Sequence, residues 1–210
     1  KNTGQCHSMP LLFLILAEEL ETEAFWCFSP SHSFIKFQDK QNRWYNIELT
    51  QGAVVTDNFY MNSGFIKSKA IQTGIYLNPR TMKQTIAHML NDLSAYYISR
   101  YGYDHFIEEN SNLVLRYSPS DLTAYQHYAN ICTVQAQYVI DACGRPPKEQ
   151  LPEYPQAHRL FKKMLQSYEK IDSLGYEEMP AEIYHNWLKQ VDKAKTLPEN
   201  QPSPIIQIKK

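Results

Sequence analysis

The stretch "TGQCHSMPLLFLILAEEL", residues Thr3–Leu20, decides how the fold of this chain is read. Its apolar run, Met9–Ala17, is too short to span a bilayer, which takes about 20 apolar residues. A secretory signal would have basic residues before such a run and small residues after it, whereas acidic residues follow here from Glu18 onward. The pattern therefore predicts a buried helix, with Cys6 at or just before its first turn.

The composition narrows the class of protein. The net charge is −1 with both signs spread along the chain, so the sequence predicts no nucleic-acid partner, because nucleic-acid binders usually carry a basic stripe. A hydrophobic content of 43% in 210 residues is typical of a soluble globular protein with one or two domains. The four cysteines have no metal-type spacing and are too few for a disulfide framework, which leaves the redox compartment open.

The first residue is Lys1 and not methionine, which indicates a fragment or a chain whose leader has been removed. Any targeting signal would then lie upstream, so cytoplasmic and exported locations both stay open. No transmembrane segment is predicted in this chain.

The chain divides near residue 80 into a region with strand signals and a region that reads as helix. Before that point, three short aromatic and β-branched segments, residues 23–29, 33–38 and 43–50, predict strands, and the last two form a hairpin. The polar turn Asp39–Asn42 joins them, and another short strand is expected at Ala53–Thr56. Residues 1–80 are therefore predicted to be a small α+β domain.

After residue 80 the sequence predicts a series of helices. Thr81 and Gln84 form a capping-box pattern, Gly102 stops that helix, and Asp104 can cap the next one. Ser120 is expected to cap a third helix, and two more follow a proline-rich connector. The predicted helices cover residues 82–101, 106–117, 121–143, 156–173 and 181–196. Residues 81–197 thus form a helical region, and the tail 198–210 is either a loose end or an added edge strand.

A weak repeat runs through the helical region. Ala95 and Ala129 lie one 34-residue period apart, and Gly102-Tyr103 followed by Pro119 resembles the turn and terminal proline of a tetratricopeptide repeat. Paired helices of that length stack with small residues at their close contacts. An ordinary helical bundle is the alternative.

Cys6 is a candidate nucleophile because a helix N-terminus favours a thiolate. Such a thiolate also needs a base and a group that orients the base. His32 starts the first strand of the predicted hairpin, and Glu48 lies in the second strand. Pairing Lys36 or Phe37 near Arg43 or Trp44 places His32 within about two residues of a position opposite Glu48. The two side chains are therefore expected to be cross-strand neighbours.

The segments "GQC", "SHSFIKF" and "WYNIEL" resemble the Cys, His and Asp segments of the transglutaminase-like superfamily. The resemblance covers about Thr3 to Thr50. It implies a papain-like domain in which Cys6 is the nucleophile, His32 the base and Glu48 the orienting carboxylate. Together with the helical repeats, the chain resembles bacterial proteins that join such a domain to tetratricopeptide repeats. The resemblance implies a peptide or protein substrate and no cofactor.

The chain also departs from that family. The third residue is Glu48 where the family usually has aspartate, and Asn46, on the same face, is an alternative orienting residue. Some relatives with this fold have lost their catalytic residues and serve only as binding modules. Taken singly, Cys6 could be a small buried residue, His32 a strand cap and Glu48 an exposed carboxylate. The competing hypotheses are therefore a thiol-dependent acyl-transfer enzyme and an inactive module that binds a peptide or protein.

Within the enzyme hypothesis, hydrolysis of an amide or peptide is favoured over crosslinking, because water is always available as the acceptor. His7 is expected to point along the helix and to take no part as a base. Cys27 is expected in the core, and no metal site is predicted.

The segment from Ala53 to Arg80 is too apolar for a flexible linker, so the helices should pack against the first domain.

Overall fold

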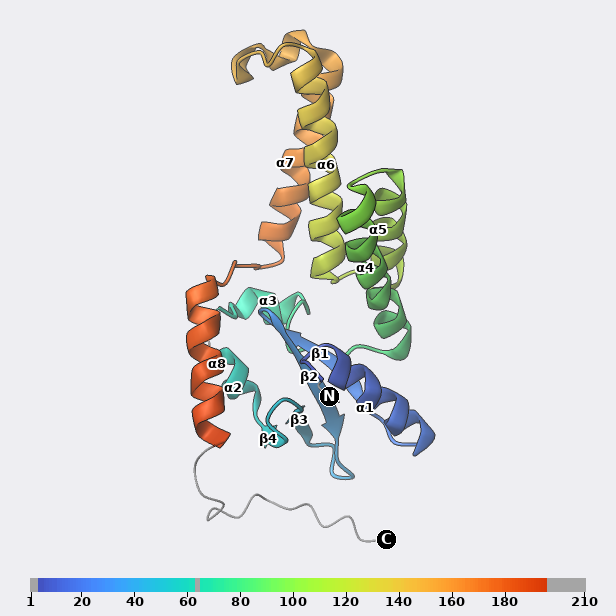
Figure 1. Ribbon diagram of the computed structural model, residues 1–210, viewed down its shortest axis with the longest axis vertical. Helices are drawn as coiled ribbons and strands as arrows, with labels where there is room; N and C mark the ends of the chain where they lie inside the picture. Colours follow the sequence, from blue (N-terminus) through green and yellow to red (C-terminus); the bar gives the residue numbers. More distant parts are fainter. Residues whose placement is uncertain (1–3, 63–64, 196–210) are drawn as a thin grey trace.

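The computed structural model describes residues 4–62 and 65–195. A four-stranded antiparallel sheet lies in the N-terminal part and is followed by a mainly helical region (Figure 1). The α+β class predicted from the sequence is confirmed. The tail 198–210 lies outside the described residues. None of the helices in the described ranges is long and apolar enough to cross a membrane.

The sheet is a simple meander in which neighbours in sequence are neighbours in space. Its strands are β1 (Phe25–Ser29), β2 (His32–Gln38), β3 (Trp44–Glu48) and β4 (Ala53–Val55). The turn between β2 and β3 is one residue longer than predicted. It is closed by the carboxylate of Asp39, which accepts the backbone N–H of Arg43 at 2.9 Å.

The register between β2 and β3 is shifted slightly from the expected pairing of Lys36 or Phe37 near Arg43 or Trp44. Lys36 pairs with Asn46, and Gln38 pairs with Trp44. Continued along β2, this register places Glu48 two residues from the position opposite His32. The two residues are therefore diagonal neighbours on one face of the sheet, within the reach of long side chains.

Both faces of β1 and of most of β2 are buried or half-buried. On one face α1 (Ser8–Glu19) packs Leu14 against Trp26 and Ile35. On the other face Cys27 and Phe34 pack against two short helices, α2 (Asp57–Met61) and α3 (Ser68–Gln72). His32 and Glu48 belong to this second face, because alternate residues of a strand point the same way as Phe34.

The helical region consists of antiparallel neighbours. Its elements are α4 (Met82–Tyr101), α5 (His105–Tyr117), α6 (Leu122–Ala142), the 3-10 helix η1 (Lys148–Glu153), α7 (Pro155–Ser173) and α8 (Ala181–Lys195). Helices α6 and α7 form a long hairpin that extends beyond α4 and α5, while α8 returns to lie beside α2 (Figure 1). The capping box of Thr81 and Gln84 and the cap at Asp104 are confirmed.

The predicted cap of α6 is wrong by one residue. Asp121, and not Ser120, is the N-cap, and its carboxylate accepts the N–H of Ala124 at 3.1 Å. The two alanines expected at equivalent repeat positions, Ala95 in α4 and Ala129 in α6, also differ in burial. Ala129 is fully buried, whereas Ala95 is exposed and its neighbour Ser94 is fully buried instead. The small-residue contact in α4 is thus displaced by one residue.

The helices pack against the sheet region, as expected from the apolar character of the connection. The segment before α4 adds to the free edge of β1 through two backbone hydrogen bonds. The N–H of Leu77 donates to the carbonyl of Phe28 at 2.9 Å, and the N–H of Arg80 donates to the carbonyl of Trp26 at 3.1 Å. At the end of α7, Leu174 enters the same core as Cys27, and its carbonyl accepts the hydroxyl of Thr73 at 2.7 Å.

Candidate active site

A cavity of about 440 Å³ lies where the sheet meets the helices. Its walls come from the N-terminal end of α1, the turn between β1 and β2, α4, α6 and the segment between α7 and α8. Cys6 and His32 both line it. The cavity falls within the size range of ligand pockets, about 300–1,000 Å³.

Cys6 lies in the turn that leads into α1, just before the N-cap residue His7. Pro10 has no N–H, so the carbonyl of Cys6, four residues earlier, lacks the helical hydrogen bond that this position would otherwise donate. The hydroxyl of Ser33 donates to that carbonyl at 2.6 Å instead. The backbone of the cysteine is thereby tied to β2, next to His32.

His32 and Glu48 form a buried pair. The Nε2 atom of His32 lies 2.7 Å from Oε2 of Glu48, and only 2% and 1% of the two side chains are exposed. The same Oε2 accepts the hydroxyl of Tyr60 at 3.0 Å. The other carboxylate oxygen accepts the N–H of Thr50 at 3.0 Å and the Thr50 hydroxyl. Four donors therefore satisfy this buried carboxylate and hold it in one orientation.

Nδ1, the second ring nitrogen of His32, is buried and has no hydrogen-bond partner among the described residues. Cys6 lies close enough to His32 for the two groups to shift each other's pKa. The imidazole of His32 lowers the pKa of Cys6, and it outweighs the opposing effect of partial burial. Burial alone would lower the pKa of His32, but Cys6 and Glu48 together raise it to about 9. The pair thus favours a thiolate beside an imidazolium.

Glu48 stays ionised in this site. Burial raises the pKa of its carboxyl. The opposing effects are larger: they come from the hydrogen bond and the charge of His32 and from the two hydrogen bonds of Thr50, and together they lower the pKa. Asn46, the alternative orienting residue, is occupied elsewhere, because its Nδ2 donates to Asp57 at 2.8 Å. Glu48 is the carboxylate that bonds His32.

The residues that surround this pair include several that the sequence did not reveal. Tyr60 and Thr50 were not singled out. Thr50 lies two residues after Glu48, a local spacing that could have indicated the contact, whereas no local pattern links Tyr60 to Glu48. The ring of Trp187 in α8 lies 5.2 Å from the ring of His32 and packs edge-on against it. This contact joins segments 155 residues apart in the numbering, and no local pattern predicts it.

His7 is placed differently from the expectation that it points along its helix. Its Nε2 lies 2.9 Å from Oδ2 of Asp92 in α4, and this contact raises the pKa of His7. The pair ties the start of α1 to the helical region. The cavity is also lined by His88 of α4 and His127 of α6, so the structure brings together four histidines.

The other cysteines have different surroundings. Cys27 is fully buried, and burial raises its pKa to about 12. Burial also raises the pKa of Cys132. In the ranges that the structure covers, no group of three or more His, Cys, Asp or Glu side chains could hold a metal ion.

Comparisons with family models, with curated proteins and with solved structures gave no match to this chain.

Proposed function

We propose that this chain is a thiol-dependent acyl-transfer enzyme in which Cys6 is the nucleophile, His32 the acid and base, and Glu48 the orienting carboxylate. The observation that carries the proposal is the buried His32–Glu48 pair, 2.7 Å apart, which lies beside Cys6 and in which His32 lowers the pKa of that thiol. A nucleophile, a base and an orienting group in this order are the requirements for a catalytic triad.

The proposed reaction begins with the thiolate of Cys6. It attacks the carbonyl carbon of an amide, and the electron pair of the carbonyl moves onto its oxygen. When the tetrahedral intermediate collapses, the C–N bond breaks, and the His32 imidazolium gives its proton to the leaving amine. The products of this half are a free amine and a thioester on Cys6.

The second half releases the acyl group. A water molecule attacks the thioester carbonyl while neutral His32 takes one of its protons. The C–S bond then breaks, which yields a carboxylic acid and restores the thiolate beside the imidazolium. Glu48 holds the ring in the required tautomer and stabilises the imidazolium in both halves. Water is the favoured acceptor, so hydrolysis is the reaction proposed here and amine transfer the less favoured variant.

The same proposal includes a more specific fold for each of the two regions. A cysteine at the start of a helix, packed on an antiparallel sheet that carries the histidine and the carboxylate, supports a transglutaminase-like, papain-like domain. The antiparallel helix pairs that follow support a tetratricopeptide-like region, whose walls help to form the cavity. A cavity shared between the two regions supports a peptide or protein as substrate.

An activated ester tests the proposal without knowledge of the natural substrate. p-Nitrophenyl acetate should acetylate Cys6 in a burst of one nitrophenolate per chain, followed by slow turnover. Cys6→Ala should abolish the burst and leave the melting temperature nearly unchanged, because Cys6 is not a core residue. A burst that survives in Cys6→Ala, or acetylation spread evenly over the four cysteines, would support the inactive binding module instead.

A further inference from the structure

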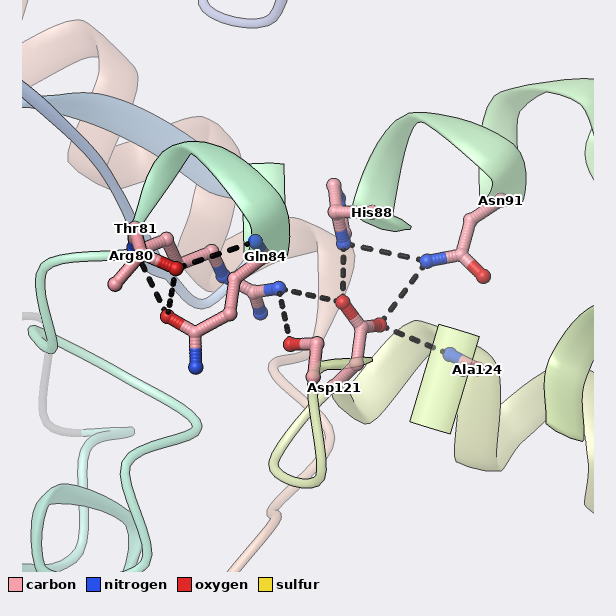
Figure 2. Close-up of polar contacts among 8 residues, drawn as sticks. Arg80, Thr81, Gln84, His88, Asn91, Asp121 and Ala124 are labelled. Carbon is pink, nitrogen blue, oxygen red and sulfur yellow. Dashed lines mark hydrogen bonds and ion pairs between the residues drawn. The ribbon is translucent and has the colours of Figure 1, made fainter. Parts of the chain in front are cut away.

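A second histidine in the cavity, His88, also contacts a buried carboxylate, but Arg80 pairs with this carboxylate as well. Figure 2 shows the buried carboxylate of Asp121, which lies between α4, α6 and the strand-edge residue Arg80. Its Oδ2 accepts Nδ1 of His88 at 2.7 Å and Nη1 of Arg80. Its Oδ1 accepts Nδ2 of Asn91 at 3.0 Å and the N–H of Ala124 at 3.1 Å. Like Glu48, this carboxylate is fully buried and has four donors.

The contact with Asp121 fixes the tautomer of His88. An ionised carboxylate only accepts hydrogen bonds, so Nδ1 of His88 must carry the proton. Among the described residues, Nε2 of His88 has no hydrogen-bond partner. In the neutral ring this atom is an acceptor. The rings of Phe28 and Trp26, at 4.4 and 5.2 Å, pack against His88 and hold its orientation.

His127, on the neighbouring helix α6, offers a second ring to the same cavity. Neither of its nitrogens has a hydrogen-bond partner among the described residues. Burial lowers the pKa of His127. A neutral imidazole keeps one N–H donor and one acceptor. When the proton of neutral His127 is on Nε2, the nitrogen that is not the buried Nδ1, the two helices present an acceptor and a donor on one wall.

This wall lies within reach of a substrate attached at Cys6. His7, the neighbour of Cys6 in the chain, has its ring 6.5 Å from the ring of His88. Cys6, His88 and His127 line one cavity of about 440 Å³. A buried or half-buried polar atom without a partner is costly, so such atoms in a cavity are best explained by a polar ligand group or by water.

We propose that His88 and His127 form a recognition subsite for a backbone amide of the substrate, with Nε2 of His88 accepting the amide N–H and His127 donating to the amide carbonyl. The inference rests on the function proposed above and specifies its substrate class. The acyl donor is a peptide-like chain that extends from Cys6 toward α4 and α6, so the helical region contributes to binding. Asp121 is a positioning residue, because it acts only through His88.

The test compares two esters that differ in the presence of amide groups. One is p-nitrophenyl acetate and the other is the p-nitrophenyl ester of N-acetylglycylglycine. His88→Asn keeps a donor for Asp121 and removes Nε2. The ratio of the two kcat/KM values, peptide ester over acetate, should fall about three- to tenfold, which is the contribution of one hydrogen bond between neutral groups.

A control and a second variant complete the test. His105→Asn, at an exposed position in α5, should leave the ratio unchanged. His127→Phe keeps a ring and removes both nitrogens, and it should also lower the ratio. An unchanged ratio in both cavity variants, while both esters still acylate Cys6, overturns the subsite and leaves the proposed function intact.

A measurement on the unaltered chain separates the two proposals. With ¹⁵N-labelled histidine, added N-acetylglycylglycinamide should shift the Nε2 resonance of His88, because this atom accepts a new hydrogen bond. An unmoved resonance at saturating peptide overturns the subsite, even if His88→Asn is too unstable to assay. Absence of a Cys6 burst with a shifted resonance contradicts the enzyme and supports peptide binding.

Discussion

Two buried carboxylates explain most of the organisation at the scale of single residues. Glu48 and Asp121 are each satisfied by four hydrogen bonds, and each orients one histidine.

Glu48 and His32 contribute to the free energy of unfolding with opposite dependence on pH. The lowered pKa of Glu48 means that its contribution is present above its unfolded-state pKa and is lost as the pH falls. The raised pKa of His32 means that its contribution is complete below about 6.5 and is lost as the pH rises through about 9.

Replacement of the carboxylate is the prediction at this scale. Glu48→Gln keeps the shape of the side chain but removes the negative charge that stabilises the His32 imidazolium. The acylation rate of Cys6 by p-nitrophenyl acetate should fall by roughly three to four orders of magnitude. The pKa of Cys6 should rise at the same time, because His32 no longer stays protonated beside it.

A matched change on the surface provides the control for this experiment. Glu19→Gln in α1 removes one exposed carboxylate that makes no ion pair in the described part of the chain, so the burst should be unchanged. Near-normal acylation in Glu48→Gln would show that His32 does not need this carboxylate.

At the scale of elements, the close approach between α3 and the end of α7 depends on one glycine. Gly175 has a φ of +83°, and a Cβ at this position would lie 2.7 Å from the backbone nitrogen of Ala70. Gly144 has a similar φ of +81°, but nothing lies within 4 Å of a Cβ there. The two positions therefore separate backbone strain from steric overlap.

The same substitution at both positions gives a prediction. Gly144→Ala should cost about 1–2 kcal/mol of unfolding free energy, because of the left-handed backbone alone. Gly175→Ala should cost about 1–3 kcal/mol more, since a backbone atom has to move to admit the methyl group. Urea unfolding of both variants measures the difference, and equal costs would contradict the close contact.

The elements that the sequence predicted are those with local signals. The capping box at Thr81 and Gln84, the cap at Asp104 and the β2–β3 hairpin all depend on residues a few positions apart, so a single sequence reveals them. The cap of α6 was misplaced by one residue, because Ser120 and Asp121 are both preferred N-cap residues and the sequence does not choose between them. In the structure Asp121 is also held by His88 and Arg80. Those partners come from other segments, and no spacing indicates them.

The candidate site shows the same division. Cys6, His32 and Glu48 were singled out from their order along the chain and from the expected hairpin. The structure brings all three to one place, with His32 and Glu48 as diagonal neighbours two residues out of register, within the expected offset. Tyr60 reaches Glu48 from α2, and Trp187 reaches His32 from α8. These contacts depend on how helices fold back onto the sheet, which periodicity and spacing do not determine.

At the scale of the whole molecule, the junction around Asp121 should couple the two regions into one cooperative unit. Arg80 follows the edge of β1, His88 lies in α4, and Asp121 starts α6. Loss of the carboxylate leaves Arg80 buried without its charged partner. Removing one member of a buried ion pair typically costs about 3–5 kcal/mol.

Thermal unfolding tests this coupling. The unaltered chain should unfold in one transition. Circular dichroism and tryptophan fluorescence should both report this transition at the same temperature. Asp121→Asn should lower the melting temperature by roughly 10 °C, given a typical shift of about 2–4 °C per kcal/mol for a chain of this size. Asp141→Asn, which breaks an exposed pair with Arg145, should leave it nearly unchanged. Two separate transitions in the unaltered chain would show that the regions unfold independently.

The central claim is that His32, held by Glu48, keeps Cys6 as a reactive thiolate, and its most direct test is the pH dependence of alkylation at each cysteine. Iodoacetamide labelling with peptide mapping should show Cys6 reacting first, with a half-maximal rate at a pH below the ordinary thiol value of 9.0. Cys27 should react last, because its pKa is raised to about 12. Glu48→Gln should move the Cys6 profile to higher pH. A Cys6 profile centred at the ordinary thiol value, and unchanged in Glu48→Gln, would contradict the claim.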